Sequence, residues 1–320
     1  MSSLVRPKGG PVTTGLVVMA YGTPASPDDV EAYYTHIRRG RPPAAEQLAE
    51  LSARYQAIGG VSPLAERTRA QADAVAAALE ADEPGRWRVA LGNKHAPPFL
   101  ETAVATVATA GAPGGPPDRI VGLVLAPHYS RGSVGEYHAR AGAAAAERGV
   151  TYAPVESWWA LPAWVEAQAA RVRAALASLP ARTEVLFTAH SLPERVLAGD
   201  PYADELRASA EAVAVAAGLD GGRWSLAWQS AGRTPEPWRG PDVVDVIRDL
   251  GAAGRADGVL VCPQGFVSDH LEVLYDLDVD ARRVATETGL AFARTASLND
   301  EPAVMAALAG VARDAAARVP

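Results

Sequence analysis

The chain lacks the features that mark exported, membrane-spanning or cluster-binding proteins. It contains one cysteine, Cys262, in 320 residues, which excludes an intrachain disulfide framework and a site built from several cysteines. Charged residues interrupt every alanine-rich segment before an apolar run reaches the roughly 18 residues of a membrane-spanning helix. Residues 1–14 are polar and broken by proline and glycine, without the apolar stretch of a secretory signal. These absences predict a cytoplasmic protein without a transmembrane segment.

Phosphate-binding and nucleic-acid-binding signals are also missing. The net charge is -7, and 48% of the residues are hydrophobic, so there is no basic surface of the kind that binds DNA or RNA. No Gly-x-Gly-x-x-Gly follows the first apolar run, and no Walker-type loop occurs anywhere. We therefore expect neither a nucleic-acid partner nor a nucleotide.

Short apolar runs alternate with longer alanine-rich segments of helical period, which is typical of α/β folds with parallel sheets covered by helices. Eight strands are predicted, four in each half, at 16–21, 88–92, 120–126, 151–157, 184–190, 225–229, 258–262 and 290–294. Amphipathic helices are predicted at 62–81, 133–148, 162–178, 201–217, 241–250 and 302–318. The boundary between the two halves is expected near Trp158–Pro162.

A histidine closes one of these strands. The run EVLFTAH ends at His190, and ligands of open α/β sheets bind beyond the carboxyl ends of the strands. An imidazole there can accept protons or bind a metal; a histidine held by backbone groups at a helix cap is the alternative. Ser191 lacks the flanking glycines of a hydrolase nucleophile elbow. Ser191 and Glu194 have the spacing of a capping box, so we expect a helix to begin there.

Three acidic residues follow another predicted strand at four-residue spacing. Glu272, Asp276 and Asp280 lie in the segment CPQGFVSDHLEVLYDLDVD, and four residues turn only about 40° around an α-helix. On such a helix the carboxylates would form a ladder, which suits a hard, hydrated divalent cation. The alternative is a solvated acidic face near a helix start, favoured by the helix dipole.

A basic cluster follows the first predicted strand. Arg38 and Arg54 belong to it, and guanidinium groups suit the recognition of carboxylates. Ile37 and the neighbouring tyrosines would supply a flat apolar wall, while an exposed basic helix end is the alternative. With the histidine and the acidic residues, the cluster points to a flat ligand with several carboxylates that meets a metal ion.

Several segments resemble the ferrochelatase family, most closely its coproporphyrin branch in Gram-positive-type bacteria. They are VVMAYGTP, YYTHIRRGR, RYQAIGGVSPL, LAPHYS, TAHSLPERV, WQSAGRTPEPWRGPDV and GFVSDHLEVLYD, in this order between Leu16 and Arg294. The resemblance implies two similar Rossmann-like, chelatase-type domains, each a four-stranded parallel sheet flanked by helices. They would span residues 1–160 and 161–300, with helix 301–320 packing back on the first and a porphyrin cleft between them. The implied activity is insertion of Fe²⁺ into coproporphyrin III to give coproheme in haem biosynthesis.

The resemblance also implies roles for individual residues. His190 and Glu272 match the catalytic pair that binds iron and accepts pyrrole protons, while Asp276 and Asp280 match outer positions that guide hydrated metal inward. Tyr21 matches the axial ligand to the product iron. The substrate-binding matches, which would hold propionates or the ring edge, are Ile37, Arg38, Arg54, Tyr55, Ser62 and Tyr137. Lys94 and His95 match a pair near the cleft, and His95 has no assigned role.

No resident cofactor is expected. Fe²⁺ is a substrate, and relatives with an iron–sulfur cluster hold it on several cysteines, which this chain lacks. The long apolar lip of membrane-associated, dimeric ferrochelatases is also missing, so we expect a monomer. Its partners would be the porphyrin, ferrous iron and, transiently, neighbouring haem-pathway enzymes. Two alternatives stay open: iron insertion into protoporphyrin IX, and a tetrapyrrole carrier without catalytic activity.

Overall fold

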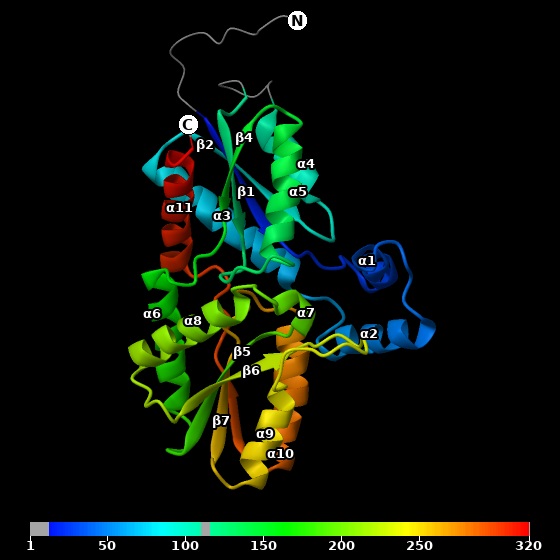
Figure 1. The fold of residues 1–320 in the computed structure, drawn as a ribbon, viewed down its shortest axis with the longest axis vertical. Helices are drawn as coiled ribbons and strands as arrows, with labels where there is room; N and C mark the ends of the chain where they lie inside the picture. Colours follow the sequence, from blue (N-terminus) through cyan, green and yellow to red (C-terminus); the bar gives the residue numbers. More distant parts are fainter. Residues whose placement is uncertain (1–12, 110–115, 320) are drawn as a thin grey trace, which may run out of the picture.

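Two four-stranded parallel sheets form the framework of the computed structural model, which describes residues 13–109 and 116–319 (Figure 1). The first sheet has the order β2-β1-β3-β4, with β1 at Thr14–Ala20, β2 at Trp87–Asn93, β3 at Arg119–Val124 and β4 at Thr151–Val155. The second has the order β6-β5-β7-β8, with β5 at Thr183–His190, β6 at Trp224–Gln229, β7 at Gly258–Cys262 and β8 at Ala291–Arg294. All eight predicted strands are present within a few residues of their expected bounds, and the predicted fold class is confirmed. Residues 1–12, which make up most of the polar N-terminal segment discussed above, lie outside the described part.

Both faces of each sheet are covered, which explains the continuous apolar runs of the strands. Every residue of β1 and of β7 is buried. Successive side chains of a strand point to opposite faces. Leu16 and Val18 therefore belong to the core on one side of the first sheet, and Val17 and Met19 to the core on the other.

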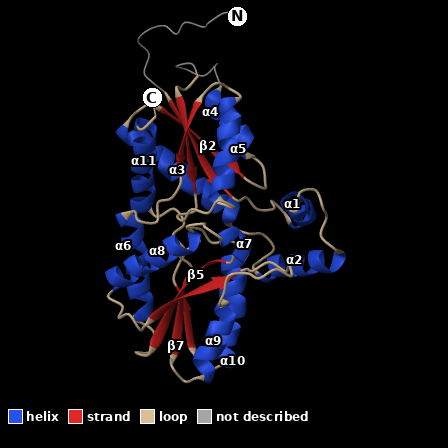
Figure 2. Ribbon diagram, viewed as in Figure 1, coloured by secondary structure: helices blue, strands red, loops and turns tan. Residues whose placement is uncertain are grey.

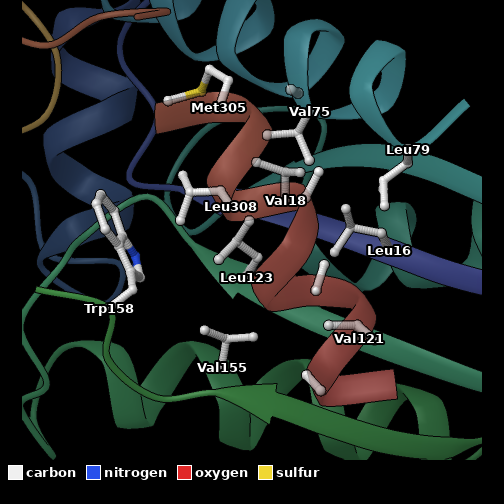
Figure 3. Packing of buried hydrophobic residues seen from close by; sticks show 14 of the residues in the cluster. Leu16, Val18, Val75, Leu79, Val121, Leu123, Val155, Trp158, Met305 and Leu308 are labelled. Carbon is white, nitrogen blue, oxygen red and sulfur yellow. The ribbon is translucent and has the colours of Figure 1, made fainter. Parts of the chain in front are cut away.

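Four helices cover the first sheet. α3 (Leu64–Asp82) and α11 (Pro302–Ala317) contribute to the core that contains Leu16, while α4 (Leu100–Ala108) and α5 (Val134–Ala146) contribute to the opposite one. Figure 3 shows Leu308 of α11 beside Val18 and Leu123 of the sheet, in the core cluster that also contains Met305. The last helix of the chain thus packs against α3, β3 and β4.

The second sheet is covered in the same way. α6 (Pro162–Leu176) and α8 (Tyr202–Ala217) pack on one face, and α9 (Val243–Ala252), the π-helix η2 (Val273–Ala281) and α10 (Arg282–Glu287) on the other (Figure 2). The chain passes from the first sheet to this unit between the end of β4 and the start of α6. No helix within residues 13–109 or 116–319 is long and apolar enough to cross a bilayer.

Two short helices that were not among the predicted segments project from the first unit. The turn η1 (Pro27–Asp29) leads into α1 (Val30–Ile37), and α2 (Ala45–Ala57) follows. Figure 1 shows both helices to one side of the two sheets. Val30 of α1 and Tyr55 of α2 form a small apolar cluster with Leu271 of the second half. Because this cluster joins residues distant in sequence, the local pattern does not reveal it.

The predicted capping box at Ser191 is wrong. Helix α7 (Glu194–Leu197) begins only after Pro193, which occupies the N-cap and forms a bridge with Trp238. The Ser191 hydroxyl instead donates to the carbonyl of Arg239 at 2.7 Å. Glu194 forms an ion pair with the same arginine at 2.8 Å. These two contacts tie the end of β5 to the loop after β6.

Candidate active site

A cavity of about 410 Å³ lies between the two sheets, beyond the carboxyl ends of their central strands. Tyr21 and His128 bring the first half of the chain to its wall, and His190 and Glu272 bring the second. A larger hollow of about 1180 Å³ adjoins it and shares Tyr21, Ile37 and Lys94. The cavity is therefore suited to a ligand held between the two halves.

His190 has a free ring nitrogen in this cavity. Its Nδ1–H donates to the carbonyl of Ser191, and because a carbonyl can only accept, the proton of the neutral ring must lie on Nδ1. Nε2 keeps its lone pair and lies 3.7 Å from Oε1 of Glu272. The imidazole can therefore accept a proton or bind a metal at Nε2.

Glu272 lies between two imidazoles. The Nδ1–H of His270 donates to the carbonyl of Ser268 at 3.0 Å, and its Nε2 lies 3.7 Å from Oε2 of Glu272. Burial favours the neutral acid, but the attraction that His190 and His270 exert when their imidazoles are protonated outweighs it and lowers the pKa of Glu272 to about 2. The carboxylate is thus anionic near neutral pH. His270 was not predicted as a site residue, although it lies only two positions before Glu272.

The three acids of the predicted ladder lie at the start of and along a π-helix rather than an α-helix. Val273–Ala281 form a π-helix with hydrogen bonds between residues i and i+5. A four-residue step therefore falls slightly short of one full turn, much as it slightly exceeds one turn in an α-helix, so the alignment of the three acids stays a prediction. Each acid has its own partners. Glu272 lies in the cavity, Asp276 pairs with Arg54, and Asp280 lies 3.7 Å from Arg283.

Asp276 accepts two hydrogen bonds, one from Arg54 and one from the hydroxyl of Ser230. Ser230 directly follows β6 and has a φ of 60°, a left-handed conformation that serine adopts rarely. Burial, together with the nearby charge of Glu272, raises the pKa of Asp276 to about 6 although Arg54 acts in the opposite direction. Ser230 was not assigned a role in the site, although it directly follows the predicted strand at 225–229.

Tyr21 lines the cavity from the first half of the chain. It follows β1, its side chain is 44% exposed, and its ring centroid lies 4.6 Å from that of His95. The Nδ1 atom of His95 is in turn 3.1 Å from that of His36. Burial and the positive charge of Lys94 lower the pKa of His95 to about 3, so its imidazole is neutral at physiological pH.

The predicted substrate-binding residues divide into two groups. Four of them line the cavity: Ile37, Tyr55, Ser62 and Tyr137. Neither arginine does. Arg38 donates to the side chain of Gln47 at 3.1 Å, and Arg54 is engaged by Asp276.

The donor set is incomplete for a metal site built by the protein alone. Within the described residues, no three His, Cys, Asp or Glu side chains are arranged to hold a metal ion. His190 and Glu272 supply one nitrogen and one carboxylate. Two such donors suit a metal that obtains its other ligands from a second molecule.

Comparisons with known proteins agree with this geometry. The sequence model of the ferrochelatase family matches residues 13–316. The coproporphyrin III ferrochelatase of Geobacillus kaustophilus is 44% identical and aligns over 93% of this chain and 95% of the relative. The enzyme of the same name from Bacillus subtilis is 43% identical, over 93% and 96%.

Solved structures add a likeness of fold. SirB from Bacillus subtilis with Fe³⁺ aligns over 96% of this chain and 97% of that chain, with a TM-score of 0.58 at 11% identity. CbiX, the terminal enzyme for biosynthesis of siroheme in denitrifying bacteria, aligns over 94% and 98%, with a TM-score of 0.53 at 17% identity. At these identities the structures establish the fold alone.

Proposed function

The chain belongs to the ferrochelatase family, and from this premise we propose that it inserts Fe²⁺ into coproporphyrin III to give coproheme in haem biosynthesis. Its class of chemistry is that of a metal chelatase, a lyase. The observation that carries the proposal is the pairing of His190 and Glu272, with the free Nε2 of the imidazole 3.7 Å from the carboxylate. Similarity to enzymes named coproporphyrin III ferrochelatase supports the choice of substrate.

The two side chains divide the work of the reaction. Insertion exchanges one Fe²⁺ for the two protons on the pyrrole nitrogens. His190 takes a proton at Nε2 and releases it before taking the second, and the 34% exposure of its side chain provides contact with solvent. Glu272, whose pKa is lowered to about 2, stays anionic. It therefore stabilises both the imidazolium and the entering cation.

Tyr21 would face the bound tetrapyrrole from the side opposite His190. It enters the cavity from the first half of the chain, whereas His190 enters from the second. If the tetrapyrrole lies between these two residues, iron would approach it from the His190 side. The phenol oxygen of Tyr21 would then be an axial ligand to the product iron.

The cavity wall and its surroundings suit a ring with carboxylate arms. Tyr55, Ser62 and Tyr137 provide hydroxyl groups and Ile37 an apolar surface. We assign the propionates of the substrate to these hydroxyl groups and to the guanidinium groups of Arg38 and Arg54. Coproporphyrin has four propionates and protoporphyrin two, so a rim with several donors favours the former.

We further propose that the enzyme works as a cytoplasmic monomer without a resident iron–sulfur cluster, in transient contact with neighbouring haem-pathway enzymes. Cys262 is the one cysteine of the sequence. It is fully buried in β7, and burial raises the pKa of its thiol to about 12. A thiol in this state is a poor metal ligand.

Parallel metalation assays test the function. The purified protein is incubated anaerobically with Fe²⁺ and either coproporphyrin III or protoporphyrin IX, and metalation is followed by absorbance. Faster metalation of coproporphyrin III is the expected result. Preference for protoporphyrin IX would replace the proposed substrate, and binding of both without metalation would identify a tetrapyrrole carrier.

A further inference from the structure

Arg54 connects the two halves of the chain at the edge of the cavity. It lies in the last turn of α2, and it pairs with Asp276 of the π-helix, 222 positions away. Its guanidinium carbon also lies 4.7 Å from the centre of the Tyr275 ring. The Nε–H of Arg54 is buried without a hydrogen-bond partner among the described residues. The guanidinium thus has an unused donor beside an occupied one.

Asp276 is equally committed to this contact. Its side chain is 13% exposed and that of Arg54 24%, and the hydroxyl of Ser230 occupies the second carboxylate oxygen. An aspartate neutralised by an arginine attracts a cation weakly, because the two charges cancel at a distance. Asp276 is therefore a poor outer metal ligand as long as no other anion competes with it for Arg54.

Both members of the pair also act on the site. The positive charge of Arg54 helps to lower the pKa of Glu272, and it partly opposes the rise that burial causes in the pKa of Tyr34 and Tyr55. All three residues line the cavity. Asp276 lies on the element that begins directly after Glu272. A carboxylate that reached Arg54 from the cavity would compete with Asp276, and a cation that reached Asp276 would compete with Arg54.

We propose that the Arg54–Asp276 ion pair couples the two substrates: a tetrapyrrole carboxylate that binds Arg54 releases Asp276 to the incoming divalent cation. This inference rests on the proposed function, since it takes a tetrapyrrole carboxylate as the competing anion. Its consequence is that metal binds better after the tetrapyrrole has bound. By thermodynamic linkage, the factor by which one substrate improves the binding of the other is the same in both directions.

A second ion pair provides a matched control. Arg233, in the loop after β6, pairs with Glu50 of α2, so it also ties α2 to the second half of the chain. Arg233→Gln weakens that attachment without touching Arg54 or Asp276. An effect caused only by a loosened α2 would appear in this variant too.

The first test is a double-mutant cycle on tetrapyrrole binding, without metal. The dissociation constant of coproporphyrin III is measured by tryptophan fluorescence quenching for the wild type, Asp276→Asn, Arg54→Gln, the double variant and Arg233→Gln. Asp276→Asn should bind about tenfold tighter than the wild type, because Arg54 is set free. This gain should vanish in the Arg54→Gln background and be absent in Arg233→Gln. A gain that persists without Arg54, or no gain in a folded Asp276→Asn variant, overturns the proposal.

The second test needs no variant. Binding of Mn²⁺ to the wild type is measured by electron paramagnetic resonance with and without zinc coproporphyrin III, which cannot take up another metal. The affinity for Mn²⁺ should rise about tenfold with the tetrapyrrole present, and equal affinities would overturn the coupling. The outcomes remain separate from the function: a protein that metalates coproporphyrin III but gives an additive cycle lacks the coupling, whereas one that does not bind coproporphyrin III lacks the proposed function.

Discussion

Replacement of His190 by alanine tests the proposed chemistry most directly. The substitution removes the one nitrogen whose lone pair is kept free by the Ser191 carbonyl and that faces Glu272 at 3.7 Å. It also removes one of the groups that lower the pKa of Glu272. Loss of a positioned general base slows reactions by about 10²–10⁴-fold, which corresponds to about 3–5 kcal/mol in the activation free energy.

Binding of the tetrapyrrole should change far less. The cavity wall is formed by many other side chains from both halves of the chain, and none of the proposed carboxylate contacts involves His190. We expect the dissociation constant of coproporphyrin III to change by less than about tenfold, or 1.4 kcal/mol. The variant should therefore bind substrate and fail to metalate it.

The assay combines two measurements on the same preparations. Fluorescence quenching gives the dissociation constant, and anaerobic absorbance changes give the rate of Fe²⁺ insertion. His138→Ala is the matched control, because His138 bonds Tyr152 at 2.8 Å and the carbonyl of Val155 at 3.0 Å and lines neither hollow. That variant should lose stability and keep its rate per folded molecule. A rate within threefold of the wild type in His190→Ala would refute the assigned base.

Three further predictions concern stability and the support of the site. Leu308→Ala empties a fully buried position in the core under α11 and should lower the free energy of unfolding by about 3 kcal/mol in urea titrations; a loss below about 1 kcal/mol would contradict the packing. Gly265→Ala places a methyl group 2.5 Å from Cβ and 2.7 Å from Cα of Ala189, the residue before His190, and should reduce chelation about 100-fold. Gly221→Ala, with nothing within 4 Å, should be neutral in the same assay, and equal rates for the two variants would refute the argument. Burial lowers the pKa of His128 to about 3, whereas an unfolded histidine has a pKa of about 6.5. Between about pH 6.5 and 5 only the unfolded chain therefore takes up this proton. The free energy of unfolding falls by about 2 kcal/mol as the pH is lowered over this interval. In urea titrations, the free energy of unfolding of His128→Gln should fall by about 2 kcal/mol less than that of the wild type over this interval. An equal fall in the two proteins would contradict this assignment.

The strands and their ends could be predicted from the sequence because their signal is local. A parallel strand buried on both faces must be apolar throughout, as β1 and β7 are, and polar residues can follow only where the strand leaves the core. His190 was located in this way. The motif GFVSDHLEVLYD was likewise sufficient to single out Glu272.

The partners of these residues were decided only by the tertiary structure. The sequence does not show that Arg54 meets Asp276 across 222 positions, nor that α2 lies beside the π-helix. It also does not show that Nδ1 of His190 pairs with the Ser191 carbonyl while Nε2 faces Glu272. The physical reason is that burial of an apolar run depends on a few neighbouring residues, whereas the partner of a charge or a hydrogen-bond donor depends on which distant segments the packed sheets bring within about 3 Å of it.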